Sequence, residues 1–204
     1  MINHKKNAAT LGLLWQDGWY LAASKRASPF FNARPQGDVS LGQVNLSEVS
    51  LLVIHHISLP AGEFSGHFVD DLFMGALDCK AHPSFAELNG LEVSAHFFIR
   101  RDGELIQYVS CDDRAWHAGV SCFDGRDNCN DFAIGIELEG TGETAYTAAQ
   151  YRQLIKLTND ITVAYPKITV DRICGHSDIA PGRKHDPGAS FDWIGYRQGL
   201  QASR

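Results

Sequence analysis

The stretch Ser50-Leu51-Leu52-Val53-Ile54-His55-His56-Ile57 is a continuous apolar run that ends in two histidines. An apolar run without polar alternation is typical of a strand buried on both faces of a sheet. The break at Leu59-Pro60-Ala61-Gly62 ends the strand. Because such a strand needs a layer on each side, the stretch predicts a central sheet covered by helices.

The rest of the chain supplies the other elements of this fold. Arg101-Asp102-Gly103-Glu104 is typical of a hairpin turn, and Thr147-Ala148-Ala149-Gln150 is a capping box that opens a helix ending before Pro166. The other expected elements are strands over 93–100, 105–109, 132–138 and 172–174 and helices over 68–77 and 193–200. Strands interleaved with helices predict an α/β (α+β) fold with a central mixed β-sheet flanked by helices.

The length and the net charge of the chain indicate how many domains it forms and which partners are unexpected. A chain of 204 residues without repeats or linkers fits a single domain over 1–204, in which about 1–48 forms a wrapping N-terminal segment. The formal net charge of −6 argues against nucleic acid or an anionic membrane as a partner. No stretch reaches the length of a transmembrane helix. We expect a monomer.

The cysteines and the N-terminus indicate the compartment. The five cysteines are odd in number and include no CxxC pair, so each is interpreted as a small buried or half-buried thiol in a reducing compartment. The basic His4-Lys5-Lys6 and the partly apolar run from Ala8 to Trp15 are at the short limit of a secretion signal. A cleavage site is not evident after them. We therefore expect a cytoplasmic protein.

A second stretch, from Gly175 to Gly188, contains three side chains that can bind a metal or take part in catalysis: His176, Lys184 and Asp186. Each has an ordinary interpretation: a solvated loop histidine, a surface lysine and an aspartate that caps a turn. Together with His55, however, two histidines and an aspartate from separate segments can hold zinc through three protein ligands and leave one position for water. A hydrolytic zinc site is our leading hypothesis.

Two carboxylates interrupt the apolar strand Ile134-Gly135-Ile136-Glu137-Leu138-Glu139. A glutamate is rarely buried unless it is paired or bound to a metal. Glu139 lies nearer the turn at Gly140, so we expect Glu139 to be the solvated member of the pair. A desolvated Glu137 next to a metal site is suited to act as general base in metal-assisted hydrolysis.

Six motifs along the chain, taken together, resemble one known family. They are Leu51–Pro60, Val93–His96, Arg114–Gly119, Cys129–Phe132, Gly135–Gly140 and Gly175–Lys184. In this order they resemble the AmpD family, the cytoplasmic zinc amidases of cell-wall recycling. The wider group is the type 2 N-acetylmuramoyl-L-alanine amidases, whose fold is similar to that of phage lysozyme-type amidases and peptidoglycan recognition proteins.

The resemblance implies a reaction and its residues. The reaction is zinc-dependent hydrolysis of the amide between 1,6-anhydro-N-acetylmuramic acid and L-alanine, so the implied partner is an anhydromuropeptide. His55, His176 and Asp186 would be the ligands of Zn²⁺. Glu137 would be the base, and Lys184 the cation that stabilises the developing oxyanion.

Trp116 and His56 are the candidate substrate-binding residues. Trp116 is suited to stack on a sugar ring, with core packing as an equal alternative. Neighbours on a strand point to opposite faces, so only one of His55 and His56 can face the metal. His96 is interpreted as a structural or supporting partner of the metal site, and His117 shares the loop of Trp116.

A few positions depart from the family pattern. His56 stands where the family usually has Asn, and His185 where Thr is common. Glu92 and Asn128 stand where relatives often carry Arg. Because arginine pairs with carboxylates in a bidentate manner, the loss of both could weaken recognition of the stem peptide or move it elsewhere.

Three rival interpretations remain open at the level of sequence. An amidase of intact peptidoglycan would use the same chemistry but would require export. A binding module on the same fold would not need the base and the ligands that this chain has. An unrelated zinc hydrolase would be expected to carry a signature such as HExxH, which is absent from the sequence.

Overall fold

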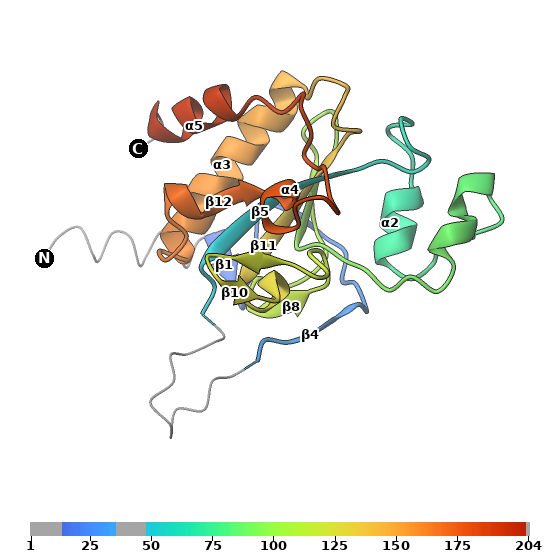
Figure 1. Ribbon diagram of the computed structural model, residues 1–204, viewed down its shortest axis with the longest axis horizontal. Coiled ribbons are helices and arrows are strands. Elements are labelled where there is room, and N and C mark those ends of the chain that lie inside the picture. Colours follow the sequence, from blue (N-terminus) through green and yellow to red (C-terminus); the bar gives the residue numbers. More distant parts are fainter. Residues whose placement is uncertain (1–13, 36–47, 203–204) are drawn as a thin grey trace, which may run out of the picture.

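The computed structural model describes residues 14–35 and 48–202, and at its centre lies a six-stranded sheet (Figure 1). The strand order is β12 (Ile173–Gly175), β5 (Leu51–Ile57), β11 (Ala133–Glu139), β6 (Phe97–Ile99), β7 (Leu105–Gln107) and β3 (Ser24–Lys25). The first four of these strands run parallel. β7 is antiparallel to β6, and β3 is parallel to β7. The predicted mixed sheet is confirmed.

The central strand β5 pairs with β11 through its whole length, from Leu51 opposite Ala133 to Ile57 opposite Glu139. The first four residues of β5 are completely buried, as the apolar run predicts. Because neighbouring parallel strands end at the same edge, the carboxyl ends of β12, β5 and β11 lie together. In open sheets of this kind ligands bind at that edge.

One face of the sheet is covered by α3 (Ala148–Ala164) and α5 (Trp193–Ala202), which lie side by side (Figure 1). α3 begins at the predicted capping box, in which the Thr147 hydroxyl accepts from the Gln150 amide and the Gln150 side chain accepts from Thr147. The apolar side chains of α3, α5 and this face form one core cluster. It includes Leu52, Ile54, Phe97, Ile134, Ile136, Leu154, Leu157, Ile161, Tyr196 and Leu200.

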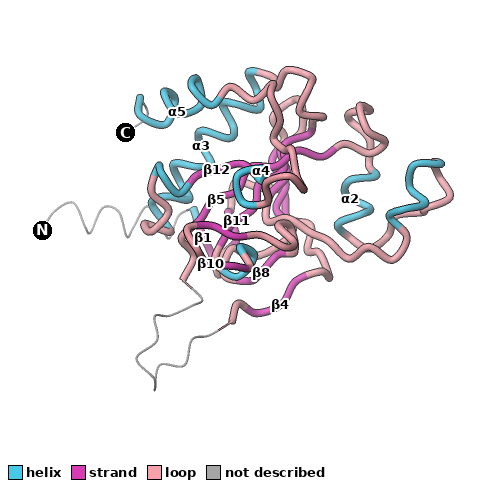
Figure 2. Tube along the Cα trace, viewed as in Figure 1, coloured by secondary structure: helices cyan, strands magenta, loops and turns pink. Residues whose placement is uncertain are grey.

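The other face carries shorter helices and long loops (Figure 2). α2 (Phe68–Phe73) packs on β6 and β7 through a cluster that includes Phe73, Phe98 and Ile106. α4 (His176–Ile179) follows β12 directly, and Ile179 packs with residues of β5. The 3-10 helices are η2 (Pro83–Leu88), η3 (Cys129–Asp131) and η4 (Val170–Arg172).

Short strand pairs lie outside the main sheet. β1 (Trp15–Gln16) pairs with β2 (Trp19–Tyr20), β4 (Phe31–Ala33) with β8 (Asp113–Ala115), and β9 (Cys122–Phe123) with β10 (Arg126–Asp127). In the described part of the N-terminal segment, β3 therefore joins the main sheet beside β7, and β4 pairs with β8. Most of the candidate secretion signal, and much of 1–48, lie outside the described residues.

Several elements are shorter than predicted, and the strand expected over 105–109, for example, ends at Gln107. The strand expected from Val93 begins at Phe97, because the backbone of Ser94 bonds to the Trp116 carbonyl and its hydroxyl bonds to the Phe30 carbonyl. The helix expected over 68–77 ends at Phe73, since Gly75 adopts a left-handed φ of 70°.

Two further observations concern the cysteines and the lengths of the helices. All five cysteines are free, and Cys122 is exposed, contrary to the expectation that each thiol is at least half-buried. Among the described residues, no helix is both long and apolar enough to cross a bilayer.

Candidate metal centre

Three side chains converge at the carboxyl edge of the sheet. His55 lies near the end of β5, His176 follows β12 immediately, and Asp186 comes from the loop after α4. The Nδ1 atoms of the two histidines are 2.9 Å apart, and each lies 3.0 Å from Oδ2 of Asp186. The sheet brings these residues together because β12 and β5 are neighbours.

The loop after α4 folds back tightly to deliver Asp186. The Asp186 carbonyl accepts a hydrogen bond from the Ser177 amide at 2.9 Å. A Cβ on Gly175 would lie 2.7 Å from Cδ of Pro187, which is closer than real Cβ contacts allow. Glycine at position 175 therefore permits the loop to pack against the start of α4 and places the carboxylate beside His176.

The chemistry of this donor set fits a metal ion. Two imidazole nitrogens and a carboxylate oxygen within 4.8 Å of one another are able to hold an ion. His176 Nε2 lies 2.9 Å from the Ala118 carbonyl oxygen. Because a carbonyl oxygen only accepts, that nitrogen carries the proton, and the lone pair of Nδ1 points toward Asp186 and His55.

The electrostatics favour the same protonation states. Burial lowers the pKa of His55 to about 4, although the adjacent Asp186 carboxylate opposes the shift. Burial alone would raise the pKa of Asp186, but the adjacent His176 and His55 rings hold that pKa below its usual value. A neutral imidazole and an ionised carboxylate are the forms that bind metals.

Glu137 lies opposite His55 in the pairing of β11 with β5. Its side chain is buried, and Oε2 has no hydrogen-bond partner among the described residues. Burial, with the nearby charge of Asp186, raises the pKa of Glu137 well above its usual value, whereas Lys184 opposes the shift. An unpartnered buried carboxylate beside a potential metal site is a candidate for catalysis.

The expectation that Glu139 is solvated is wrong, because its side chain is only 2% exposed. Its two oxygens accept hydrogen bonds from the amides of Ser65 at 2.5 Å and Arg101 at 2.9 Å. Arg100 Nη1 lies 3.9 Å away. Segments distant in the sequence cover the end of β11, so Glu139 is a structural carboxylate with partners, in contrast to Glu137.

Lys184 and His56 border a cavity of about 680 Å³ that also reaches Asp186. Lys184 is exposed, and its ammonium group makes no ion pair with the residues that the structure describes. Its charge lowers the pKa values of Glu137 and His55, which places it near both. His56 points to the face opposite His55, and burial lowers its pKa. The expectation that only one of the two histidines faces the metal site is met.

Trp116 lies against the N-terminal segment. Its ring stacks on Phe30 with centroids 6.3 Å apart, and its indole nitrogen donates to Oδ1 of Asn32 at 2.7 Å. The residues that line the 680 Å³ cavity do not include Trp116. Of the other positions that depart from the family pattern, Glu92 is exposed and Asn128 adopts a left-handed φ of 59°.

The sequence indicates no role for His117, but the structure places its Nδ1 3.0 Å from Nε2 of His55. A sequence signal for this contact exists in Gly135, the glycine inside strand β11. A Cβ there would lie 2.5 Å from the His117 ring, so the glycine leaves the space that the ring fills. His96 is also buried, and its Nδ1 accepts from the Gly135 amide at 3.0 Å.

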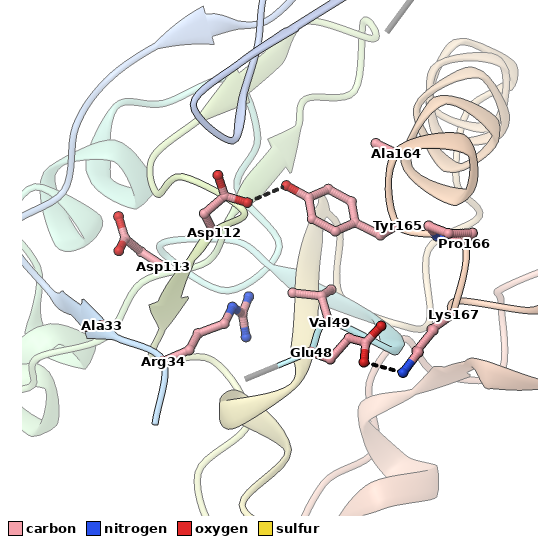
Figure 3. Close-up of a pocket in the computed structure, with 10 residues that line it drawn as sticks. All are labelled: Ala33, Arg34, Glu48, Val49, Asp112, Asp113, Ala164, Tyr165, Pro166 and Lys167. Carbon is pink, nitrogen blue, oxygen red and sulfur yellow. Dashed lines mark hydrogen bonds and ion pairs between the residues drawn. The ribbon is translucent and has the colours of Figure 1, made fainter. Parts of the chain in front are cut away.

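A second cavity, of about 450 Å³, lies at the opposite end of β5 (Figure 3). It is lined in part by Val49, six residues before His55, which corresponds to about 20 Å along a strand. Several of its charged groups already have partners: Glu48 pairs with Lys167, and Tyr165 donates to Asp112 at 3.0 Å. The carboxyl edge of the sheet is therefore the better candidate for a catalytic site.

Comparison with known proteins agrees with this geometry. Residues 45–189 match the family model of N-acetylmuramoyl-L-alanine amidases. The chain is 51% identical over 185 residues to the 1,6-anhydro-N-acetylmuramyl-L-alanine amidase AmpD of Escherichia coli K12, covering 91% of this chain and 96% of that protein.

Solved structures give the same result. A crystal structure of an AmpD derivative superposes with a TM-score of 0.85 at 51% identity, covering 92% of this chain and 99% of that one. The amidase AmiD of Escherichia coli, in complex with the substrate anhydro-N-acetylmuramic acid-L-Ala-D-gamma-Glu-L-Lys, superposes with a TM-score of 0.57 at 30% identity, covering 77% and 60%. The chain therefore belongs to the N-acetylmuramoyl-L-alanine amidase family, among the AmpD amidases.

Proposed function

We propose that this protein is a zinc-dependent amidase that hydrolyses the amide between 1,6-anhydro-N-acetylmuramic acid and L-alanine in muropeptides of cell-wall recycling. One observation carries the proposal. The possible metal ligands His55, His176 and Asp186 converge at one edge of the sheet beside Glu137, a buried carboxylate whose Oε2 has no partner among the described residues.

His55, His176 and Asp186 are the proposed zinc ligands. When bound, zinc supplies Lewis acidity, which polarises an amide carbonyl and lowers the pKa of water. The protein contributes a neutral imidazole and an ionised carboxylate, because burial keeps His55 uncharged and the two histidines keep Asp186 ionised.

Glu137 is the proposed general base. Its carboxylate takes a proton from the attacking water and returns it to the leaving amine of L-alanine. Burial raises the pKa of Glu137, which makes its carboxylate a stronger base than one in water. Its Oε2 has no hydrogen-bond partner among the described residues. The nearby positive charge of Lys184 lowers the pKa of Glu137 and so opposes part of this increase.

Lys184 is proposed to stabilise the negative charge that develops on the scissile carbonyl oxygen. Its ammonium group has no ion pair within the described ranges, so it is free to meet a charge that appears only during the reaction. His56, on the wall of the adjoining cavity, is proposed to contact the substrate, and so is Trp116 on its loop.

The names of the relatives support the choice of substrate. AmpD of Escherichia coli is named for 1,6-anhydro-N-acetylmuramyl-L-alanine, and AmiD has been solved with an anhydromuramyl peptide. We propose the same class of substrate for this chain, acting as a monomer with a single domain. The five free cysteines support a reducing compartment, for which we propose the cytoplasm.

The test uses purified, zinc-loaded protein with anhydromuramyl-tripeptide and, separately, with intact peptidoglycan sacculi, and mass spectrometry reads the products. We expect free tripeptide and anhydro sugar from the soluble substrate and little release from sacculi. Release mainly from sacculi would instead identify a wall hydrolase that acts outside the cytoplasm. A protein that retains zinc and cleaves neither substrate would contradict the proposed activity and favour a binding module.

A further inference from the structure

Both histidines of the candidate metal centre make their outer hydrogen bonds to one short loop. His55 Nε2 lies 3.0 Å from Nδ1 of His117, and His176 Nε2 donates to the carbonyl of the next residue, Ala118, at 2.9 Å. One ligand lies in strand β5 and the other is the first residue of α4, but their outer nitrogens meet consecutive residues. The position of this loop therefore affects both rings at once.

The buried side chain of Asn130 helps to hold the loop in place, together with Arg183, whose Nη2 donates to the Ala118 carbonyl at 2.7 Å. Oδ1 of Asn130 accepts hydrogen bonds from the backbone amides of both His117, at 3.1 Å, and Ala118, at 2.8 Å. Asn130 is itself anchored, because its carbonyl accepts from Nη1 of Arg34 at 3.0 Å. Its side chain thus helps to order the two residues that contact the ligand histidines.

The His117 ring lies where an apolar ring would pack as well or better. It fills the space above Gly135 and contacts the rings of His55 and His96, with centroids 5.0 and 5.6 Å apart. Its Nε2 is buried and has no hydrogen-bond partner among the described residues. A buried polar atom without a partner is unfavourable, so packing alone does not explain a histidine here.

The hydrogen-bond acceptor that His117 offers at its Nδ1 does explain why a histidine stands at this position. A histidine that binds a metal through Nδ1 must carry its proton on Nε2, and that proton needs an acceptor. For His176 the acceptor is a backbone carbonyl. For His55 it is the imidazole of His117, whose own proton then sits on the unpartnered Nε2.

We propose that His117 and Asn130 are positioning residues of the metal centre. Asn130 orders the loop, and His117 accepts the Nε2 proton of His55 so that Nδ1 is free to bind the metal. The inference rests on the metal site of the proposed function. It assigns a role to His117 of the motif Arg114–Gly119 and to Asn130 of the motif Cys129–Phe132, neither of which has a direct part in the proposed reaction.

The test measures the zinc dissociation constant by competition with a chromophoric chelator. His117→Phe keeps the ring volume and removes the acceptor, and we expect zinc to bind about 10- to 100-fold more weakly. His117→Asn places an amide oxygen near the position of Nδ1 and should restore most of the affinity. Asn130→Ala should weaken zinc binding in the same direction, and Asn130→Asp, which keeps an oxygen acceptor, should restore it.

A matched control and a spectroscopic readout separate positioning from a general loss of structure. Thr158→Val removes a buried hydrogen bond to Tyr196 within the α3–α5 layer and should leave zinc affinity within about twofold of wild type. In the cobalt-substituted protein, the visible absorption of the bound ion should change in His117→Phe and return in His117→Asn. The same variants should keep the circular dichroism of the wild type.

The outcomes are distinguishable. Wild-type protein that binds no zinc would overturn the proposed function, and the inference with it. Wild-type protein that binds zinc while His117→Phe binds equally tightly would overturn the inference alone. A loss in His117→Phe that His117→Asn does not restore would also overturn it, because ring shape rather than the acceptor would then be what matters.

Discussion

Glu137 lies directly opposite His55 in the parallel pairing of β11 with β5, so both side chains project to the same face of the sheet near its carboxyl edge. This register places a carboxylate without a hydrogen-bond partner among the described residues beside a potential metal ligand. A slip of one residue would turn Glu137 to the opposite face, among the side chains that pack on α3. The pairing of two strands thus creates the proposed base.

Glu137→Gln tests the base. The substitution keeps the shape of the side chain and removes its ability to take a proton, so we expect kcat to fall about 10²- to 10⁴-fold. Zinc content should stay near that of the wild type, because Glu137 is not a proposed ligand. Turnover of anhydromuramyl-tripeptide and metal analysis of the same sample measure both quantities, and a fully active variant would exclude Glu137 as the base.

Asp186→Ala tests the third ligand. We expect zinc occupancy to fall, because two imidazoles alone would hold the ion and one proposed ligand would be missing. Metal analysis after dialysis against a weak chelator measures the loss. Asp171→Asn, which removes an exposed carboxylate, is the matched control. Unchanged zinc content in Asp186→Ala would remove this residue from the ligand set.

Lys184→Met tests the proposed oxyanion contact. The side chain is exposed, so the substitution should leave the free energy of unfolding within about 0.5 kcal/mol of the wild type. We expect kcat to fall while zinc affinity stays unchanged, since the charge acts on the transition state. Lys80→Met, at another exposed lysine, is the control. Equal kcat values in the two variants would contradict the assigned role.

Glu139→Gln tests the structural carboxylate of β11. The amide can replace only part of the acceptor capacity that the amides of Ser65 and Arg101 use, so we expect a loss of about 1 to 3 kcal/mol in unfolding free energy. Urea unfolding measures it, and Glu63→Gln at an exposed position is the control. A variant as stable as the wild type would show that these contacts contribute little.

The metal-free protein should lose stability in mild acid. Burial lowers the pKa of His55 to about 4 and the pKa values of His96 and His117 well below their ordinary 6.5. The unfolded chain binds protons at these rings below about pH 6.5, but the folded chain does not. Their contribution is therefore complete above that pH and falls as the pH drops, by up to about 1.4 kcal/mol per pH unit for each ring.

Urea unfolding of chelator-treated protein at several pH values between 7.5 and 5 checks this expectation. The unfolding free energy should decrease toward the acid end. His67→Gln, which removes an exposed ring, should leave the slope unchanged. Glu137, whose pKa burial raises, takes up a proton in the folded chain over the same range and opposes the effect of one ring at most. A flat profile would therefore contradict the expectation for the three rings.

Local patterns were sufficient for the elements of the fold. The apolar run in Leu51–Ile57 and the capping box at Thr147 depend on neighbours within a few residues, and the structure has a strand and a helix there. The predicted length of a strand was wrong where a distant segment forms hydrogen bonds with residues that were expected to extend it. Ser94 bonds to Trp116 and Phe30 instead of extending β6.

The sequence by itself determined the residue types of the site and their order along the chain, because ligand chemistry and motif spacing are local properties. Only the tertiary structure decided which carboxylate is unpartnered, since the amides that bond to Glu139 come from Ser65 and Arg101, 74 and 38 residues away. It also decided that His117, 62 residues from His55, supplies the acceptor for that ring. Both depend on which loops pack against the edge of the sheet, and no local pattern encodes that choice.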